Sequence, residues 1–156
     1  MKGDPAAAEC PANITDASIG IVVSDWHSEI TQVLLDNAIE ALKECGVERD
    51  DVYVAHVPGA MELPFGARQM AIVQEPSAVI VLGCIVREGN PLYDSIERSV
   101  TSGITNLNLH SDIPYLFGVL TTESEDQAKQ YAAEMGTETA KSAIRMVNMM
   151  ASLVNS

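Results

Sequence analysis

Aromatic and basic residues are both scarce in this chain of 156 residues. Aromatic side chains make up 4% of it, with a single tryptophan, and nine Lys and Arg stand against 22 Asp and Glu. The resulting formal net charge of −13 repels the backbone of nucleic acids and the surface of anionic membranes. We therefore expect no nucleic-acid or membrane partner.

Long hydrophobic runs and clustered cysteines are missing as well. The longest apolar run, residues 78–86, is too short to cross a membrane and suits a buried strand. The first residues lack the apolar stretch of a signal peptide. Cys10, Cys45 and Cys84 are odd in number and lack a metal-type spacing. We expect a reduced, cytoplasmic protein with no disulfide framework and no metal site.

The composition that remains is typical of one folded domain. Hydrophobic residues make up 47% of the chain and charged residues 20%. Residues 1–18 are rich in Ala, Pro and Asp and show no period, so we expect an arm that is flexible or forms an added edge strand. Residues 19–156 are expected to form the domain.

Strand and helix patterns alternate along that domain. Ser28 is placed to cap the first helix and Gly46 to end it, while Thr122 or Ser124 could cap the fourth. Gly136 is expected to interrupt that helix before a last amphipathic one. The expected strands cover residues 19–23, 51–57, 78–82 and 115–120, and the expected helices cover residues 28–45, 61–73, 91–109 and 122–135.

This alternation predicts an α/β fold in which a parallel sheet carries helices on both faces. Binding sites in such sheets lie beyond the carboxyl ends of the strands. The segments that follow Val23, Val57, Gly83 and Leu120 are therefore the ones to inspect.

These segments contain several candidate residues, each with an ordinary alternative role. Trp26 could stack on a flat heterocycle or simply be a packing residue, and His27 could be a catalyst or an exposed loop histidine. Glu62 could bind hydroxyl groups or only favour a helix start. Gly89 lies in a turn of the kind that binds anions, but Glu88 beside it would repel phosphate. The acidic stretch of residues 123–126 suits helix capping better than metal binding.

Four motifs in these segments resemble the 6,7-dimethyl-8-ribityllumazine synthase family. The resemblance is collinear from about residue 19 to residue 153. The motifs are Ile21-Val22-Val23 followed by Trp26, and the stretches of residues 57–64, 82–87 and 117–122.

The resemblance implies a flavodoxin-like three-layer sandwich with a four-stranded parallel sheet. It also implies pentamers, or larger decamers and icosahedral capsids, in which residues 1–18 pair with a neighbouring subunit and the active site lies between subunits. The implied reaction of riboflavin biosynthesis joins a ribityl-amino-pyrimidinedione to 3,4-dihydroxy-2-butanone 4-phosphate and needs no cofactor. Phosphate and water leave.

The resemblance also implies roles for individual residues. Trp26 would stack on the heterocycle, and Phe117 of a neighbouring subunit would cover its other side. The remaining substrate-binding positions are Ala60, Met61 and Glu62 along the ribityl chain and Cys84, Ile85 and Val86 along the ring edge.

The phosphate and proton-transfer side departs from the family pattern. Leu92 stands where the family has its proton-transferring histidine, so the catalytic residue is unknown and His27 is a possible substitute. Glu88 and Asn90, on either side of Gly89, replace a glycine and a threonine that hold the phosphate, and Tyr131 replaces an arginine. The loop that follows, residues 135–141, is shorter than in the family, and Lys129 or Lys141 might supply a cation.

Three hypotheses follow from this asymmetry. The chain is a lumazine synthase with reduced activity, or a non-catalytic oligomer that binds lumazine or a flavin, or a homologue kept for building a cage.

Overall fold

The computed structural model describes residues 16–156, so most of the expected N-terminal arm lies outside the described residues. A four-stranded parallel sheet forms the centre, with the strand order β2-β1-β3-β4. The strands are β1 (Ile19–Ser24), β2 (Val52–Val57), β3 (Ala78–Val86) and β4 (Tyr115–Thr122). The α-helices are α1 (Ser28–Glu44), α2 (Leu63–Gln74), α3 (Tyr93–Leu109) and α4 (Glu125–Val154).

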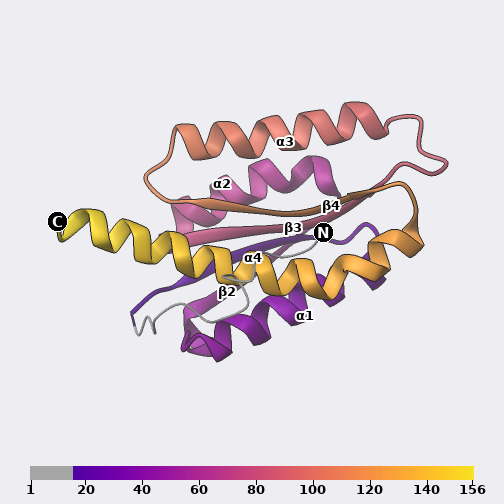
Figure 1. Cartoon of the computed structure of the whole chain (residues 1–156). Coiled ribbons are helices and arrows are strands. Elements are labelled where there is room, and N and C mark those ends of the chain that lie inside the picture. The colour runs from indigo at the N-terminus through magenta and orange to yellow at the C-terminus, as the bar shows by residue number, and fades with distance from the viewer. Residues whose placement is uncertain (1–15) are drawn as a thin grey trace.

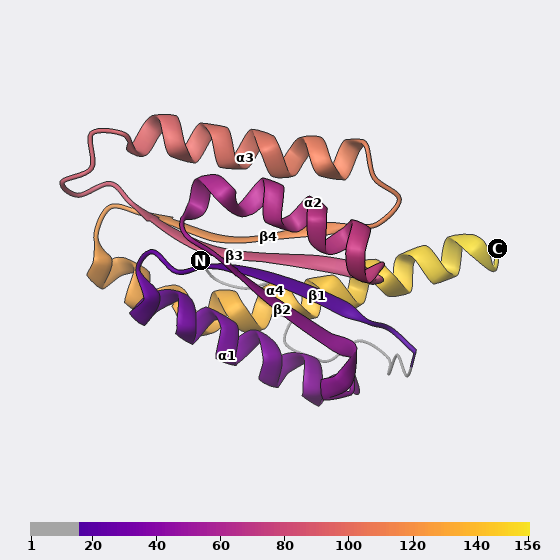
Figure 2. The same ribbon diagram turned by 180° about the vertical axis from the view of Figure 1, so that it is seen from behind.

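Two helices cover each face of the sheet (Figures 1 and 2), which confirms the three-layer α/β prediction. Alternate residues of the buried strand β3 point to opposite layers. Ile80 and Leu82 pack with α1 and α4, whereas Val79 and Val81 pack with α2 and α3. No helix in the described part of the chain is long and apolar enough to cross a membrane.

The predicted end of α1 at Gly46 and the predicted cap of α4 at Ser124 agree with the structure, whereas the predicted cap at Ser28 does not. Gly46 follows α1 with a φ of 89°, the left-handed geometry that ends helices, and Ser124 caps α4 by accepting a hydrogen bond from the Gln127 backbone N–H at 3.1 Å. The predicted Ser28 cap is wrong, because Ser28 is already the first helical residue. His27 occupies the cap position and makes no side-chain cap bond there.

Helix α4 runs without interruption for 30 residues, so the predicted break at Gly136 and the short loop at residues 135–141 are wrong. Gly136 is buried against α1, and a Cβ at this position would collide with the carbonyl oxygen of Leu34. The glycine therefore allows two helices to approach closely, which stabilises the packing rather than ending the helix.

Of the cysteines in the described part of the chain, Cys84 is free and is buried in β3. Cys10 lies outside the described residues.

Candidate active site

A cavity of about 790 Å³ opens where the parallel strands end, the position that open α/β sheets favour for ligands. The loops after β1, β2 and β3 and the first turn of α4 form its walls. The lining residues are Trp26, His27, Gly59, Ala60, Met61, Glu62, Cys84, Ile85, Val86, Glu88, Gly89, Asn90, Ile96, Glu125 and Asp126.

The backbone pins Trp26 to the loop that follows β2. The backbone N–H of Asp25 donates to Val57 O at 2.8 Å, and that of Trp26 donates to Pro58 O at 3.0 Å. The indole is 70% exposed and meets the His27 ring edge-on, with 6.1 Å between the ring centroids. An anchored backbone with an exposed ring favours stacking on a ligand over a packing role.

His27 is held in the cavity wall by its backbone and by a partner on α4. Its φ of 60° and ψ of 48° place it in the left-handed region, which is uncommon for residues other than glycine. Its Nδ1 lies 3.2 Å from Glu125 Oε1, and its side chain is 18% exposed. This pairing leaves Nε2 as the ring nitrogen available to a substrate.

The segment after β2 supplies one polar and two apolar groups to the wall. A short 3₁₀ turn, Ala60–Glu62, leads into α2, with Pro64 in the first helical turn as its fixed φ favours. The Glu62 backbone N–H donates to Gly59 O at 3.2 Å, so Ala60, Met61 and Glu62 are presented on a tight turn. A carboxylate here can accept hydrogen bonds from the hydroxyl groups of a polyol.

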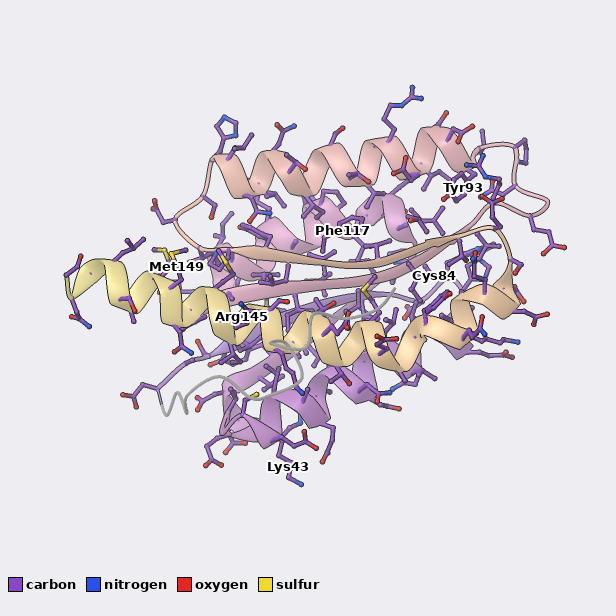
Figure 3. All side chains as sticks on the ribbon, viewed as in Figure 1. Lys43, Cys84, Tyr93, Phe117, Arg145 and Met149 are labelled. Carbon is purple, nitrogen blue, oxygen red and sulfur yellow. The ribbon has the colours of Figure 1, made fainter. Side chains whose placement is uncertain are left out.

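The carboxyl end of β3 forms an apolar wall that includes the free thiol. Cys84, Ile85 and Val86 are buried, and Figure 3 shows Cys84 between the sheet and α4. Burial, followed by the charge of Glu125, raises the pKa of the Cys84 thiol to about 12. The thiol is therefore neutral at physiological pH and is a wall residue rather than a nucleophile.

Comparison with known proteins shows the family to which the chain is related. A family model described as 6,7-dimethyl-8-ribityllumazine synthase matches residues 16–151. A 6,7-dimethyl-8-ribityllumazine synthase of Parabacteroides distasonis is 47% identical over 146 residues, which cover 89% of this chain and 91% of that protein. Proteins of the same name from Porphyromonas gingivalis and Bacteroides fragilis are 43% and 39% identical, covering 86% of this chain and 86% and 96% of theirs.

The chain belongs to the 6,7-dimethyl-8-ribityllumazine synthase family.

Two of the positions where this lumazine synthase family member departs from the expected pattern lie outside the cavity. Leu92, at the position of the expected histidine, is 61% exposed just before α3 and does not line the cavity. Tyr131, at the position of the expected arginine, is partly buried on α4 and packs against the core beside α1. Glu88, Gly89 and Asn90 do line it.

Phe117 also lies apart from the cavity of its own chain. It pairs with Val81 in the middle of the sheet, whereas Cys84 pairs with Leu120 three residues closer to the strand ends. Figure 3 shows the two side chains well separated. At about 3.3 Å per residue, Phe117 is some 10 Å from the level of Cys84 along the strand.

Arg87, next to the cavity, already forms ion pairs with two carboxylates. Its Nε lies 3.1 Å from Glu123 Oε1, its Nη1 lies 3.1 Å from Asp94 Oδ1, and its guanidinium sits 4.2 Å from the centre of the Tyr93 ring. Glu88, its neighbour in the sequence, is not one of its ion-pair partners among the described residues, which are Asp94 and Glu123.

Sequence reasoning missed Glu125 and Asp126 as cavity residues because an acidic first turn is common in helices. The signal that could have revealed them is positional. They follow β4 as directly as Trp26 follows β1, and so belong to the same edge of the sheet.

Proposed function

We propose that this protein condenses a ribityl-amino-pyrimidinedione with 3,4-dihydroxy-2-butanone 4-phosphate to form a lumazine, at a reduced rate. The observation that carries the proposal is the cavity itself, which gathers Trp26, Ala60, Glu62 and Cys84 from the segments after β1 and β2 and from the end of β3. Family membership supports the same reaction.

The pyrimidinedione occupies the half of the cavity nearest β1, β2 and β3. Its flat ring stacks on Trp26, and its ribityl hydroxyl groups donate to Glu62. The apolar wall of Ile85 and Val86 borders the ring edge. Holding the diamine in this way supplies positioning, which alone lowers the barrier to condensation.

Proton transfer falls to His27 in this proposal. Imine formation requires a proton to leave the attacking amine and a proton to reach the departing hydroxyl group. Glu125, 3.2 Å from Nδ1, stabilises the protonated ring that exists between these two steps. Losing the family histidine without full compensation would lower the rate by about 10²–10⁴-fold.

A neighbouring subunit completes the site. Phe117 is 37% exposed and lies away from the cavity of its own chain, so it is placed to cover the ligand of an adjacent copy. We accordingly expect a homopentamer or a larger assembly of pentamers.

An absorbance assay of lumazine formation tests the proposal. Purified protein is mixed with both substrates, and the rate is compared with a protein-free control, since the condensation proceeds slowly unaided. A rate clearly above the control is expected, and a rate equal to the control would exclude the enzyme. Titration with lumazine and riboflavin, followed by Trp26 fluorescence, would then separate a flavin-binding protein from a cage that binds neither.

A further inference from the structure

The half of the cavity beyond the heterocycle is strongly acidic. Glu88 on the loop after β3 and Glu125 and Asp126 on α4 line it, and Glu62 lines the opposite side. No Lys or Arg is among the lining residues of the described chain. A phosphate dianion placed here would face carboxylates in a partly enclosed site, where repulsion is stronger than in water.

The cations nearest this half are already neutralised. Arg87 is held between Glu123 and Asp94 at 3.1 Å each. Lys129 Nζ lies 3.7 Å from Glu29 Oε2, and both residues line a separate pocket that also includes His27. Recruiting either cation to a phosphate would therefore break an ion pair and leave its carboxylates beside the ligand.

Most of the backbone N–H groups between residues 87 and 93 are also committed within the chain, and that of Gly89 is the exception. The backbone N–H groups of Glu88 and Asn90 donate to Glu123 O at 3.0 Å and to Arg87 O at 2.9 Å. Leu92 N–H donates to Asn90 Oδ1 at 3.0 Å. Tyr93 N–H donates to Asn90 O at 3.2 Å. An anion-binding turn presents several such groups to its ligand, whereas this loop uses all but the Gly89 N–H to hold its own shape.

We propose that this half of the cavity takes an uncharged 1,2-dicarbonyl compound in preference to the phosphate ester. The inference rests on the proposed function, because it concerns the second substrate of the same condensation. A neutral diketone meets no repulsion from Glu88, Glu125 or Asp126, and one of its carbonyl oxygens can accept a hydrogen bond from His27 Nε2. The probe compound is 2,3-butanedione.

The reaction balances without an oxidant or a reductant. The primary amine of the pyrimidinedione adds to one carbonyl carbon and forms a C=N bond, and the ribityl-bearing nitrogen forms a C–N bond with the other. Both oxygen atoms leave as water. The four hydrogens come from the primary amine (two), the secondary amine (one) and the ring N–H (one). The product is the same lumazine that the phosphate ester gives with loss of phosphate and two waters.

Because both partners yield one product, a single absorbance readout compares them. The rate with each partner is divided by its own protein-free rate, at constant ionic strength. We expect the acceleration with 2,3-butanedione to exceed that with the phosphate ester by about tenfold or more. We also expect inorganic phosphate to leave the 2,3-butanedione rate unchanged.

A charge-reversal variant sharpens the comparison. Glu88→Lys places a cation where the carboxylate stood, so it should shift the ratio of the two accelerations toward the phosphate ester and make inorganic phosphate an inhibitor. Glu40→Lys makes the same change of net charge on an exposed position of α1 outside the cavity, and it should leave the ratio as it is.

Two results would overturn the inference, and they differ in what they say about the enzyme. A larger acceleration with the phosphate ester, or saturable inhibition of the unsubstituted protein by phosphate, would mean that another copy of the chain supplies a cation. The proposed function would then stand. No acceleration with either partner, with lumazine still quenching Trp26 fluorescence, would overturn the inference and the proposed function together.

Discussion

His27 combines an unfavourable backbone geometry with a side chain that is fixed in the wall of the cavity. Left-handed residues other than glycine cost free energy and persist where the surrounding structure demands them. Two sets of contacts hold His27 in this conformation. The backbone N–H groups of Asp25 and Trp26 donate hydrogen bonds to the end of β2 and the loop after it, and Glu125 pairs with the imidazole ring. The left-handed backbone of His27 is therefore maintained by contacts that also hold its imidazole ring in the cavity wall.

Replacing this imidazole should affect the rate more than the fold. Asparagine tolerates the left-handed region, so His27→Asn should keep the unfolding temperature while lowering the lumazine-forming rate by about 10²-fold. His110→Asn, on the exposed end of α3 away from the cavity, is the matched control and should leave the rate unchanged. Equal rates for the two variants would remove His27 from the mechanism.

The raised pKa of the buried Cys84 thiol leads us to expect a loss of stability at alkaline pH. The thiol ionises near pH 9.0 when exposed and near pH 12 when folded, because burial and then the charge of Glu125 raise its pKa. The folded state thus binds the proton more tightly, so this contribution is complete below pH 9 and is lost as the pH rises toward 12. A pKa raised from 9.0 to about 12 corresponds to a loss on the order of 4 kcal/mol across that interval.

Urea unfolding at a series of pH values checks this sign. The free energy of unfolding of the unsubstituted protein should fall more steeply above pH 9 than that of Cys84→Ala, which lacks the ionising group. Parallel curves for the two proteins would show that the thiol ionises equally in both states.

At the scale of elements, the close contact between α1 and α4 makes Gly136 irreplaceable. Alanine is normally the better helix residue by about 1 kcal/mol, but here its Cβ would collide with the Leu34 carbonyl oxygen. Gly136→Ala should therefore destabilise the protein by about 1–3 kcal/mol in urea unfolding. The reverse change at an exposed position of the same helix, Ala133→Gly, should cost about 1 kcal/mol from propensity alone. A stabilised Gly136→Ala protein would contradict the packing argument.

The elements were predictable from the sequence where local periodicity decides them. The buried strand at Ala78–Val86 and the cap at Ser124 depend on patterns within a few residues. Gly136 was misread because its role depends on Leu34, about a hundred residues away in sequence, and no local pattern carries that contact. Ser28 was misread because the backbone bonds of Asp25 and Trp26 set where α1 starts.

The candidate site was predictable to a similar degree. The strand-end rule and the family resemblance together pointed to Trp26, Ala60, Glu62 and the end of β3, which do converge on one cavity. They did not reveal the contact between His27 and Glu125, because these residues are about a hundred positions apart in the sequence and no local pattern links them.

At the scale of the whole molecule, a site shared between subunits should be restored by mixing two defective proteins. Trp26→Ala damages the cavity of its own subunit, and Phe117→Ala damages the cavity of a neighbour. After dissociation and reassembly at equal amounts, about a quarter of the sites in a ring should combine an intact cavity with an intact Phe117. The lumazine-forming rate of the mixture should rise accordingly above that of either variant.

A second mixture provides the control. Trp26→Ala and Glu62→Ala both damage the cavity of their own subunit, so their mixture should recover nothing. If the first mixture also recovers nothing, Phe117 acts within its own chain or not at all.

Helix α4 begins at the cavity and, at 30 residues, extends about 45 Å to the opposite end of the molecule, where its last turns project past the sheet (Figure 1). The two ends of this helix therefore lie far apart: Glu125 lines the cavity, whereas the residues that follow Val154 are exposed. A dye, a peptide or a solid support joined to the exposed Ser156 would be held away from the cavity by the length of the helix, so this position suits immobilising or labelling the protein.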